Sequence, residues 1–162
     1  MPRIEAAHDL TVDAATAFAV SQTHGPQRLA WDPFVKHQEL VGGSRPAKGV
    51  RTHTVSRHGL KMVTEYVSFR EPTQVGMKMV EGPWFFANFA AGWAFAPIDH
   101  DDPTAGTRAT WRYTFTTRPS WLSPIADRIG TRLLQRDIEA RIAAYAAACV
   151  NPEVLASIHQ TG

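Results

Sequence analysis

Residues 123–149 read SPIADRIGTRLLQRDIEARIAAYAAAC, and this stretch predicts one long helix. Apart from the adjacent Leu133 and Leu134, its apolar residues recur at spacings of three or four: Ile125, Ile129, Leu133, Leu134, Ile138, Ile142, Tyr145 and Cys149. Such spacing places them in one apolar stripe along a helix of about seven turns. Pro124 suits the first turn of this helix, and Pro152 marks its end. A helix with a single apolar stripe needs an apolar surface on which to lie.

The segments before this helix predict that surface. Strand signals occur at residues 35–41, 50–57, 60–70, 74–81, 85–97 and 107–118. Short turns rich in Gly and Pro separate these ranges, which favours an antiparallel meander. Residues 3–12 predict a first strand, and two short helices are expected between this strand and residue 35. We therefore predict an α+β fold in which a curved antiparallel sheet of about seven strands wraps around the C-terminal helix.

Composition narrows the class of protein. The chain has 162 residues and a net charge of +2, which is too small to favour nucleic acid as a partner. Cys149 is the one cysteine, so no internal disulfide can form, and zinc-binding or nucleotide-binding motifs are absent from the sequence. We expect no metal and no cofactor. We also expect no integral membrane segment and no signal peptide, and hence a cytoplasmic protein.

Five segments carry a resemblance to a known family. They are LTVDAATAFAV (10–20), WDPFVKHQELVGG (31–43), KGVRTHTV (48–55), VSFREPTQVGMKMVEGP (67–83) and WAFAPIDHDDPTAGTRATWRYTF (93–115). In order and spacing they resemble the SRPBCC or START-like (helix-grip) superfamily, in particular its polyketide cyclase/dehydrase and lipid-transport branch. The resemblance implies one ligand-binding domain over residues 1–150, followed by a C-terminal tail at 151–162. It also implies a deep cavity between sheet and helix that holds a hydrophobic small molecule.

Alternation within the strands predicts which side chains share the inward face. In 107–118 that face carries Trp111, Tyr113 and Phe115, and in 85–97 it carries further aromatic rings. An ordinary packed core is the alternative interpretation of each ring. We predict the following ligand contacts: Trp31, Val67, Phe69, Met77, Asn88, Phe89, Trp93, Phe95, Trp111, Tyr113, Phe115, Ile129 and Leu133.

The strand at 60–70 leaves its register open. The more apolar face carries Val67 and Phe69, and we expect this face to point inward together with Glu65. Burial would raise the pKa of the Glu65 carboxyl and make it a candidate acid or base. In the opposite register Tyr66 faces the cavity instead. The candidate catalytic residues are therefore Glu65, Tyr66 and Tyr113.

Two functions follow from this interpretation. In the first, the protein binds a hydrophobic small molecule, such as a lipid or a polyketide-like compound, in the internal cavity. In the second, it is a cofactor-independent cyclase or dehydrase that acts on an aromatic polyketide-like substrate in the same cavity. The second function requires a polar group that moves a proton, and the first does not.

Overall fold

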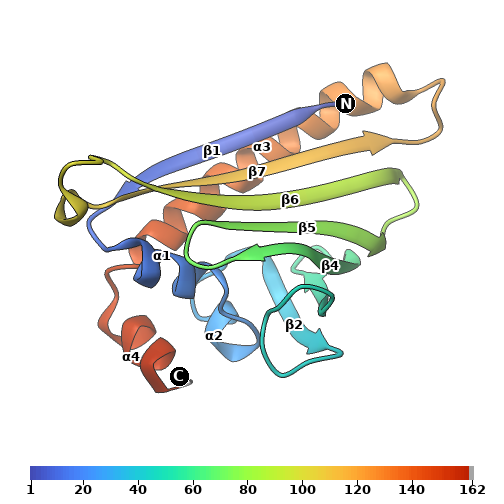
Figure 1. Ribbon diagram of the computed structural model, residues 1–162. Coiled ribbons are helices and arrows are strands. Elements are labelled where there is room, and N and C mark those ends of the chain that lie inside the picture. Colours follow the sequence, from blue (N-terminus) through green and yellow to red (C-terminus); the bar gives the residue numbers. More distant parts are fainter. Residues whose placement is uncertain (161–162) are drawn as a thin grey trace.

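One antiparallel sheet of seven strands dominates the computed structural model, which describes residues 1–160. The strands are β1 (Arg3–Leu10), β2 (Val35–Val41), β3 (Arg51–Ser56), β4 (Lys61–Arg70), β5 (Gln74–Glu81), β6 (Phe86–Pro97) and β7 (Thr107–Thr117). Their order across the sheet is β1-β7-β6-β5-β4-β3-β2, so β2 to β7 form a meander and β1 joins its far edge (Figure 1). This arrangement confirms the predicted sheet.

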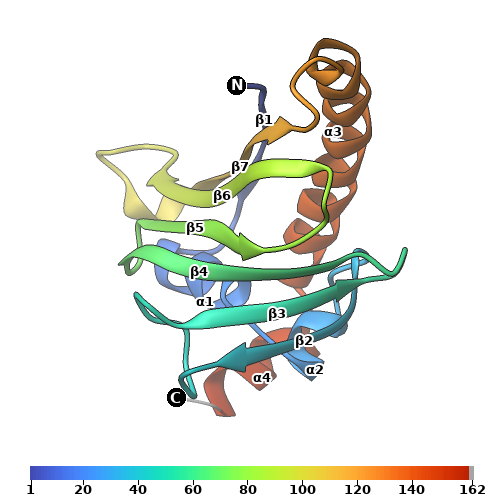
Figure 2. The ribbon, with the colours of Figure 1, turned by 90° about the vertical axis from the view of Figure 1, so that its right-hand side faces the viewer.

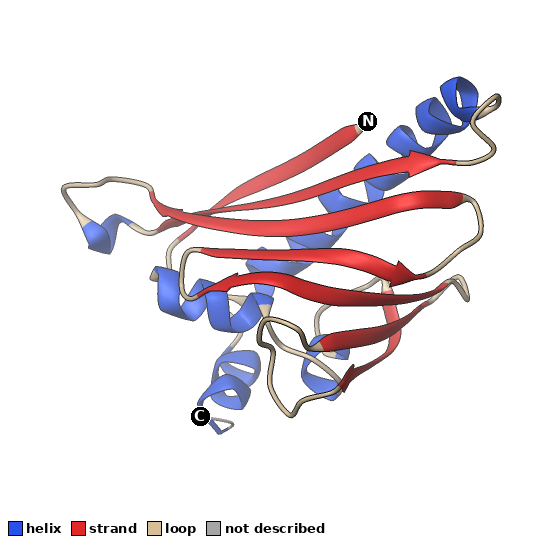
Figure 3. Cartoon of the chain, turned by 45° about the vertical axis from the view of Figure 1, so that its right-hand side comes forward, coloured by secondary structure: helices blue, strands red, loops and turns tan. Residues whose placement is uncertain are grey.

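The helices are α1 (Ala14–Ser21), α2 (Pro26–Leu29), α3 (Ser123–Ala148) and α4 (Pro152–Gln160), with a short 3₁₀ helix, η1 (Pro103–Ala105), in the turn before β7. Three of the helices, α1, α2 and α3, pack against this sheet, and α4 packs against α1. Figure 2 shows the long helix α3 running along one side of the curved sheet, and Figure 3 shows it crossing behind the strands. The α+β helix-grip architecture predicted from the sequence is thus confirmed. None of the helices in the described part of the chain is long and apolar enough to cross a membrane.

The first helix closes one end of the sheet. The Asp13 side chain caps α1 by accepting a hydrogen bond of 2.8 Å from the Thr16 amide. Phe18 then packs edge-on against Phe69 of β4 and Phe95 of β6. The Tyr145 hydroxyl of α3 donates to a backbone carbonyl of α1 and ties the two helices together. The main core therefore lies between α1, the second half of α3 and the middle of the sheet.

The apolar stripe of α3 does not lie on the sheet over its whole length, which corrects the prediction. Ile138, Ile142 and Tyr145 are buried, whereas Ile129 is 55% exposed and Leu133 is 62% exposed. A helix turns by about 100° per residue, so Leu133 points about 120° away from Tyr145, twelve residues later. Residues spaced by four, as at the start of the stripe, are each turned by about 40° relative to the one before, so the stripe winds slowly around the helix. The first half of α3 therefore leaves part of its apolar surface uncovered.

Residues 151–162 were expected to form a tail, but most of them form α4. Val154 of α4 is buried, and the helix packs against α1. The Asn151 side chain accepts hydrogen bonds from the amides of Glu153 and Val154 and so caps this helix. Residues 161–162 of the predicted tail lie outside the described residues.

Candidate ligand-binding site

A cavity of about 680 Å³ lies between the sheet and α3. Its larger apolar lining residues are Phe34, Leu60, Met62, Val75, Met77, Phe85, Phe86, Phe89, Trp93, Trp111, Ile129, Leu133 and Leu134. Close-packed protein interiors leave few voids larger than a water molecule, so a space of this size is not a packing defect. It falls within the range of sites that bind small molecules, about 300–1,000 Å³.

Aromatic rings from β6 and β7 form one wall of the cavity. The rings of Trp93 and Trp111 stack with their centroids 4.2 Å apart, and those of Phe89 and Tyr113 lie 5.3 Å apart. All four side chains line the cavity. The two strands pair without a shift in this region, so regular alternation brings these rings to one face. A flat apolar ligand can stack against such a wall.

The opposite wall, formed by β2, β3 and β4, is polar and uncharged. The hydroxyls of Thr52 and Thr64 lie 2.7 Å apart. The Tyr66 hydroxyl donates to the Gln22 side-chain oxygen at 3.1 Å. Burial raises the pKa of Tyr66 to about 12, so this phenol stays neutral and offers hydrogen bonds rather than charge.

A buried ion cluster lies at the inner part of the cavity. Asp32 is fully buried and accepts hydrogen bonds from Arg28 Nε at 2.7 Å and from Arg141 Nη2 at 2.7 Å and Nε at 3.1 Å. Burial alone would raise the pKa of the Asp32 carboxyl. The charges and hydrogen bonds of Arg141 and Arg28 together outweigh burial and hold this pKa well below its ordinary value. Asp32 is therefore an anion at neutral pH.

The cluster continues into two further groups that line the cavity. Arg141 Nη1 donates to the Tyr113 hydroxyl at 2.6 Å, and burial raises the pKa of Tyr113 well above its ordinary value. The Asp137 carboxylate lies 3.9 Å from the same Arg141 nitrogen. Burial raises the pKa of Asp137, although Arg141 opposes that shift. Among the cavity-lining residues that the structure describes, Asp137 has the one carboxyl group.

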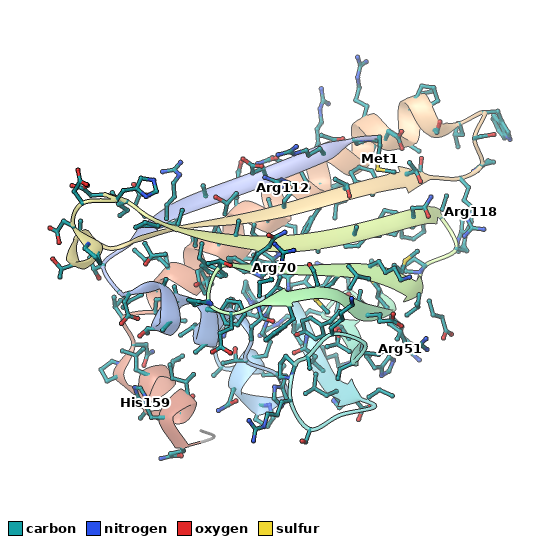
Figure 4. The ribbon with its side chains drawn as sticks, in the orientation of Figure 1. Met1, Arg51, Arg70, Arg112, Arg118 and His159 are labelled. Carbon is teal, nitrogen blue, oxygen red and sulfur yellow. The ribbon has the colours of Figure 1, made fainter. Side chains whose placement is uncertain are left out.

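The lining residues Ile129 and Leu133, near the end of the molecule where β7 leads into α3, are largely exposed, so the cavity reaches the surface there. Phe85, Ile129 and Leu133 line this mouth, together with Arg118, which donates two hydrogen bonds to the Phe86 carbonyl. Figure 4 shows Arg118 at this end of the sheet. Apolar side chains that are largely exposed continue around the mouth on α3, which gives an apolar ligand a route to the interior.

Seven of the predicted ligand contacts line the cavity: Met77, Phe89, Trp93, Trp111, Tyr113, Ile129 and Leu133. Their contact with a ligand stays a prediction. Tyr66, the alternative candidate of β4, lines the cavity as well.

The expected register of β4 is wrong. Glu65 lies on the outer face and accepts a hydrogen bond of 3.0 Å from Arg51 Nε, and Val67 is 39% exposed. The β4 residues that line the cavity are Met62, Thr64 and Tyr66. Because this wall of the cavity is polar, the more apolar face of the strand does not identify the inward side. Glu65 is accordingly no candidate for chemistry in the cavity.

Asn88 is a second correction. Its side chain is exposed on the outer face of the sheet and donates to the Thr116 hydroxyl at 3.1 Å. Asn88 directly precedes Phe89, which lines the cavity, so alternation places Asn88 on the opposite face. The pairing of β6 with β7 shifts between Phe86 and Asn88, and this irregularity turns Phe86 toward the core. An irregularity of this kind interrupts simple alternation.

Four other predicted contacts belong to the packed core and do not line the cavity: Trp31, Phe69, Phe95 and Phe115. Trp31 donates from Nε1 to the Thr23 hydroxyl at 2.9 Å and packs against Tyr145. Phe115 is fully buried against Phe86. The packed-core alternative therefore holds for these rings.

Sequence reasoning missed the charged residues of the cluster, Arg28, Asp32, Asp137 and Arg141. One signal was present: Arg141 lies three residues after Ile138 and four before Tyr145, which places a charge on the buried face of α3. A charged residue is seldom buried without a partner. The partner, Asp32, is 109 residues away in sequence, and no local pattern indicates that pairing.

No group of three or more His, Cys, Asp or Glu side chains within residues 1–160 is arranged to hold a metal ion. The cavity lining offers aromatic rings, hydroxyls, the side-chain amides of Gln22 and Gln38, and the ion cluster.

A family model described as polyketide cyclase / dehydrase and lipid transport matches residues 1–150. The chain belongs to this family. The resemblance seen in the sequence is thereby confirmed, and a hydrophobic ligand-binding fold is supported for the chain. A search of curated proteins finds no match.

Solved structures of the same fold share little sequence with this protein. TTHA0849 from Thermus thermophilus is 15% identical with a TM-score of 0.72, over 96% of this chain and 99% of that one. A START superfamily protein from Mycobacterium smegmatis is 11% identical with a TM-score of 0.68, over 99% of both chains. Ara h 8.0201 is 14% identical with a TM-score of 0.69, over 92% of this chain and 97% of that one. At such identities the likeness shows the fold alone.

Proposed function

We propose that this protein binds a hydrophobic small molecule, a lipid or a polyketide-like compound, in the cavity between the sheet and α3. The observation that carries the proposal is the cavity itself, about 680 Å³ in volume with an aromatic wall on β6 and β7. An apolar ligand gains free energy by leaving water, about 25 cal/mol per Å² of apolar surface buried. The apolar mouth at the first half of α3 supports the same function.

A titration tests this proposal. The emission of Trp93 and Trp111, which line the cavity, is followed while a fluorescent fatty acid or a flat polycyclic phenol is added. We expect saturable binding with one ligand per chain. Absence of any apolar ligand binding would overturn the proposal.

A matched pair of variants locates the binding. Ala91 lines the cavity between Phe89 and Trp93, so Ala91→Phe fills part of it and is expected to weaken binding. Ala94 lies on the outer face of the same strand and is exposed, so Ala94→Phe is expected to leave binding unchanged. Equal effects of the two substitutions would place the ligand elsewhere.

A cyclase or dehydrase that acts on an aromatic polyketide-like substrate is the second candidate function. Its support is Asp137, the carboxyl group of the cavity wall, whose pKa is raised by burial and which is therefore a candidate to donate or accept a proton. Tyr66 and Tyr113 have pKa values raised by burial, so both suit hydrogen-bond donation better than proton abstraction.

Turnover distinguishes the two functions. If the protein is a cyclase, it converts a poly-β-ketone chain to a cyclic product, and Asp137→Asn abolishes that conversion while Glu65→Gln on the outer face retains it. Tight binding of the chain without product supports the first function and excludes the second for that substrate.

A further inference from the structure

We propose that the inner part of the cavity binds the carboxylate of an amphipathic acid, with Arg28 as its charged contact and Tyr113 as a hydrogen-bond donor. The inference rests on the proposed function and adds the chemical class of the ligand: an apolar body that carries one acidic group.

The hydrogen bonds of Arg28 leave one of its terminal nitrogens free. Arg28 Nε donates to Asp32 at 2.7 Å, and Nη1 donates to the Ser21 carbonyl at 2.7 Å. No residue in the described chain accepts a hydrogen bond from Nη2, although Arg28 is only 7% exposed and lines the cavity. A buried guanidinium with unused donors is costly, and an acceptor on a ligand removes that cost.

Charge balance points to an anionic acceptor. Arg28 and Arg141 share the single carboxylate of Asp32, so the pair of guanidinium groups carries one positive charge more than its buried partner. The next acidic group, Asp137, pairs with Arg141 at 3.9 Å, and among the described residues Arg28 has no carboxylate besides that of Asp32. A ligand carboxylate at Arg28 would give this guanidinium a counter-ion that it does not share with Arg141.

Tyr113 supplies a second donor in the same part of the cavity. Its hydroxyl oxygen accepts from Arg141, so its own proton is directed elsewhere, and no acceptor for it occurs among residues 1–160. Trp111, two residues earlier on the same face of β7, neighbours both donors, and its ring centroid lies 5.8 Å from that of Tyr113. The guanidinium carbon of Arg141 lies 4.3 Å from its ring centroid, and that of Arg28 lies 5.5 Å away. A charged and a neutral donor near one another are suited to a carboxylate.

The rest of the ligand then lies against the apolar wall. From the ion cluster the aromatic side chains of β6 and β7 line the cavity towards the mouth at Ile129 and Leu133. A small hydrophilic acid would leave this surface in contact with water, whereas an acid with a long or polycyclic apolar body covers it. The combination of one buried cationic anchor and an apolar channel therefore defines an amphipathic acid.

The test compares an acid with its own ester in the wild-type protein. Lauric acid and methyl laurate have the same apolar chain, and each is used at neutral pH to displace a neutral fluorescent probe from the cavity. We expect the acid to displace the probe at a concentration lower by roughly tenfold or more, because hydrogen bonds between charged groups are stronger than neutral ones. Equal displacement by acid and ester overturns this inference and leaves the proposed function standing. Failure of the neutral probe and of both laurates to bind overturns both.

Variants assign the preference to the two donors. Arg28→Gln is expected to abolish the preference for the acid, and Tyr113→Phe is expected to reduce it. Arg112→Gln is the control, because Arg112 is the neighbour of Tyr113 on the outer face and pairs with Glu5. If Arg28→Gln does not fold, the acid–ester ratio of wild type and of Tyr113→Phe decides the question. An unchanged ratio in Tyr113→Phe removes this residue from the site.

Discussion

A single carboxylate, Asp32, joins three segments of the chain. It binds Arg28 of α2 and Arg141 of α3, and it also accepts a hydrogen bond of 3.1 Å from the Phe34 amide just before β2. Each guanidinium also lies against an aromatic ring, Arg28 over Trp31 and Arg141 over Trp111, at 4.4 and 4.3 Å from the ring centroids. The residue that holds α2 to α3 is therefore charged, and its removal takes from two buried cations the carboxylate that they share.

Asp32→Asn is expected to lower the free energy of unfolding by about 3–5 kcal/mol, the range for breaking a buried ion pair from one side. Urea unfolding followed by far-ultraviolet circular dichroism measures it. The control is Asp9→Asn, which removes an exposed pair with Arg108 and is expected to cost less than about 1 kcal/mol. Similar losses in the two variants would show that Asp32 does not have the structural role described.

The pH dependence of stability follows from two opposite pKa shifts. Asp32 has its pKa lowered in the folded state, so its contribution is complete above the unfolded value of about 3.9 and is lost as the pH falls through the lower folded pKa. Asp137 has its pKa raised, so protonation on lowering the pH towards the unfolded value stabilises the folded state. Measured across mildly to strongly acidic pH, Asp32→Asn is expected to lessen acid destabilisation. Asp137→Asn is expected to remove a rise in stability at mildly acidic pH. A wild-type pH profile shared by both variants would contradict these shifts.

The two halves of the helix α3 have different roles. Its second half buries Ile138 and Ile142 in the core, while its first half lines the cavity mouth with Ile129 and Leu133. Gly130 marks the place where the helix approaches the sheet closely, because a Cβ atom there would lie 3.1 Å from the Phe115 ring. The same helix therefore anchors the fold at one end and forms the opening at the other.

Matched truncations test this division of α3. Ile142→Ala is expected to lower the free energy of unfolding by about 2–5 kcal/mol, since it leaves a cavity in a packed region. Ile125→Ala, in the exposed first turn, is expected to cost less than about 1 kcal/mol. Chemical denaturation of both variants is the measurement. A large loss in Ile125→Ala would mean that the first half of α3 is packed against the protein.

Local patterns predicted the elements well and their faces less well. Alternation placed Trp111 and Tyr113 correctly because β7 pairs regularly with both of its neighbours over these residues. It failed for β4, where the pairing with β5 shifts between Tyr66 and Ser68, so that Tyr66 and Phe69 both turn inward. Irregular pairing of this kind depends on the partner strand, and the sequence of one strand does not contain that information.

Segments that are distant in the chain together form the ligand-binding site. The aromatic wall comes from neighbouring strands, and a sequence pattern can predict it. The polar side requires β2, β3 and β4 to face α3, and the ion cluster requires α2 to meet α3. Those contacts exist only after the sheet has curved around the helix, which explains why Arg28 and Asp137 escaped prediction from sequence.

Methyl-resolved nuclear magnetic resonance during titration with an apolar ligand locates the binding site. We predict saturable chemical-shift changes, at one ligand per chain, in the methyl groups that line the cavity, those of Val75, Met77 and Leu134. Exposed valines outside the cavity, Val41 and Val67, are expected to keep their positions. Shifts confined to such surface methyl groups, or no shift at all, would contradict a ligand-binding cavity between the sheet and α3.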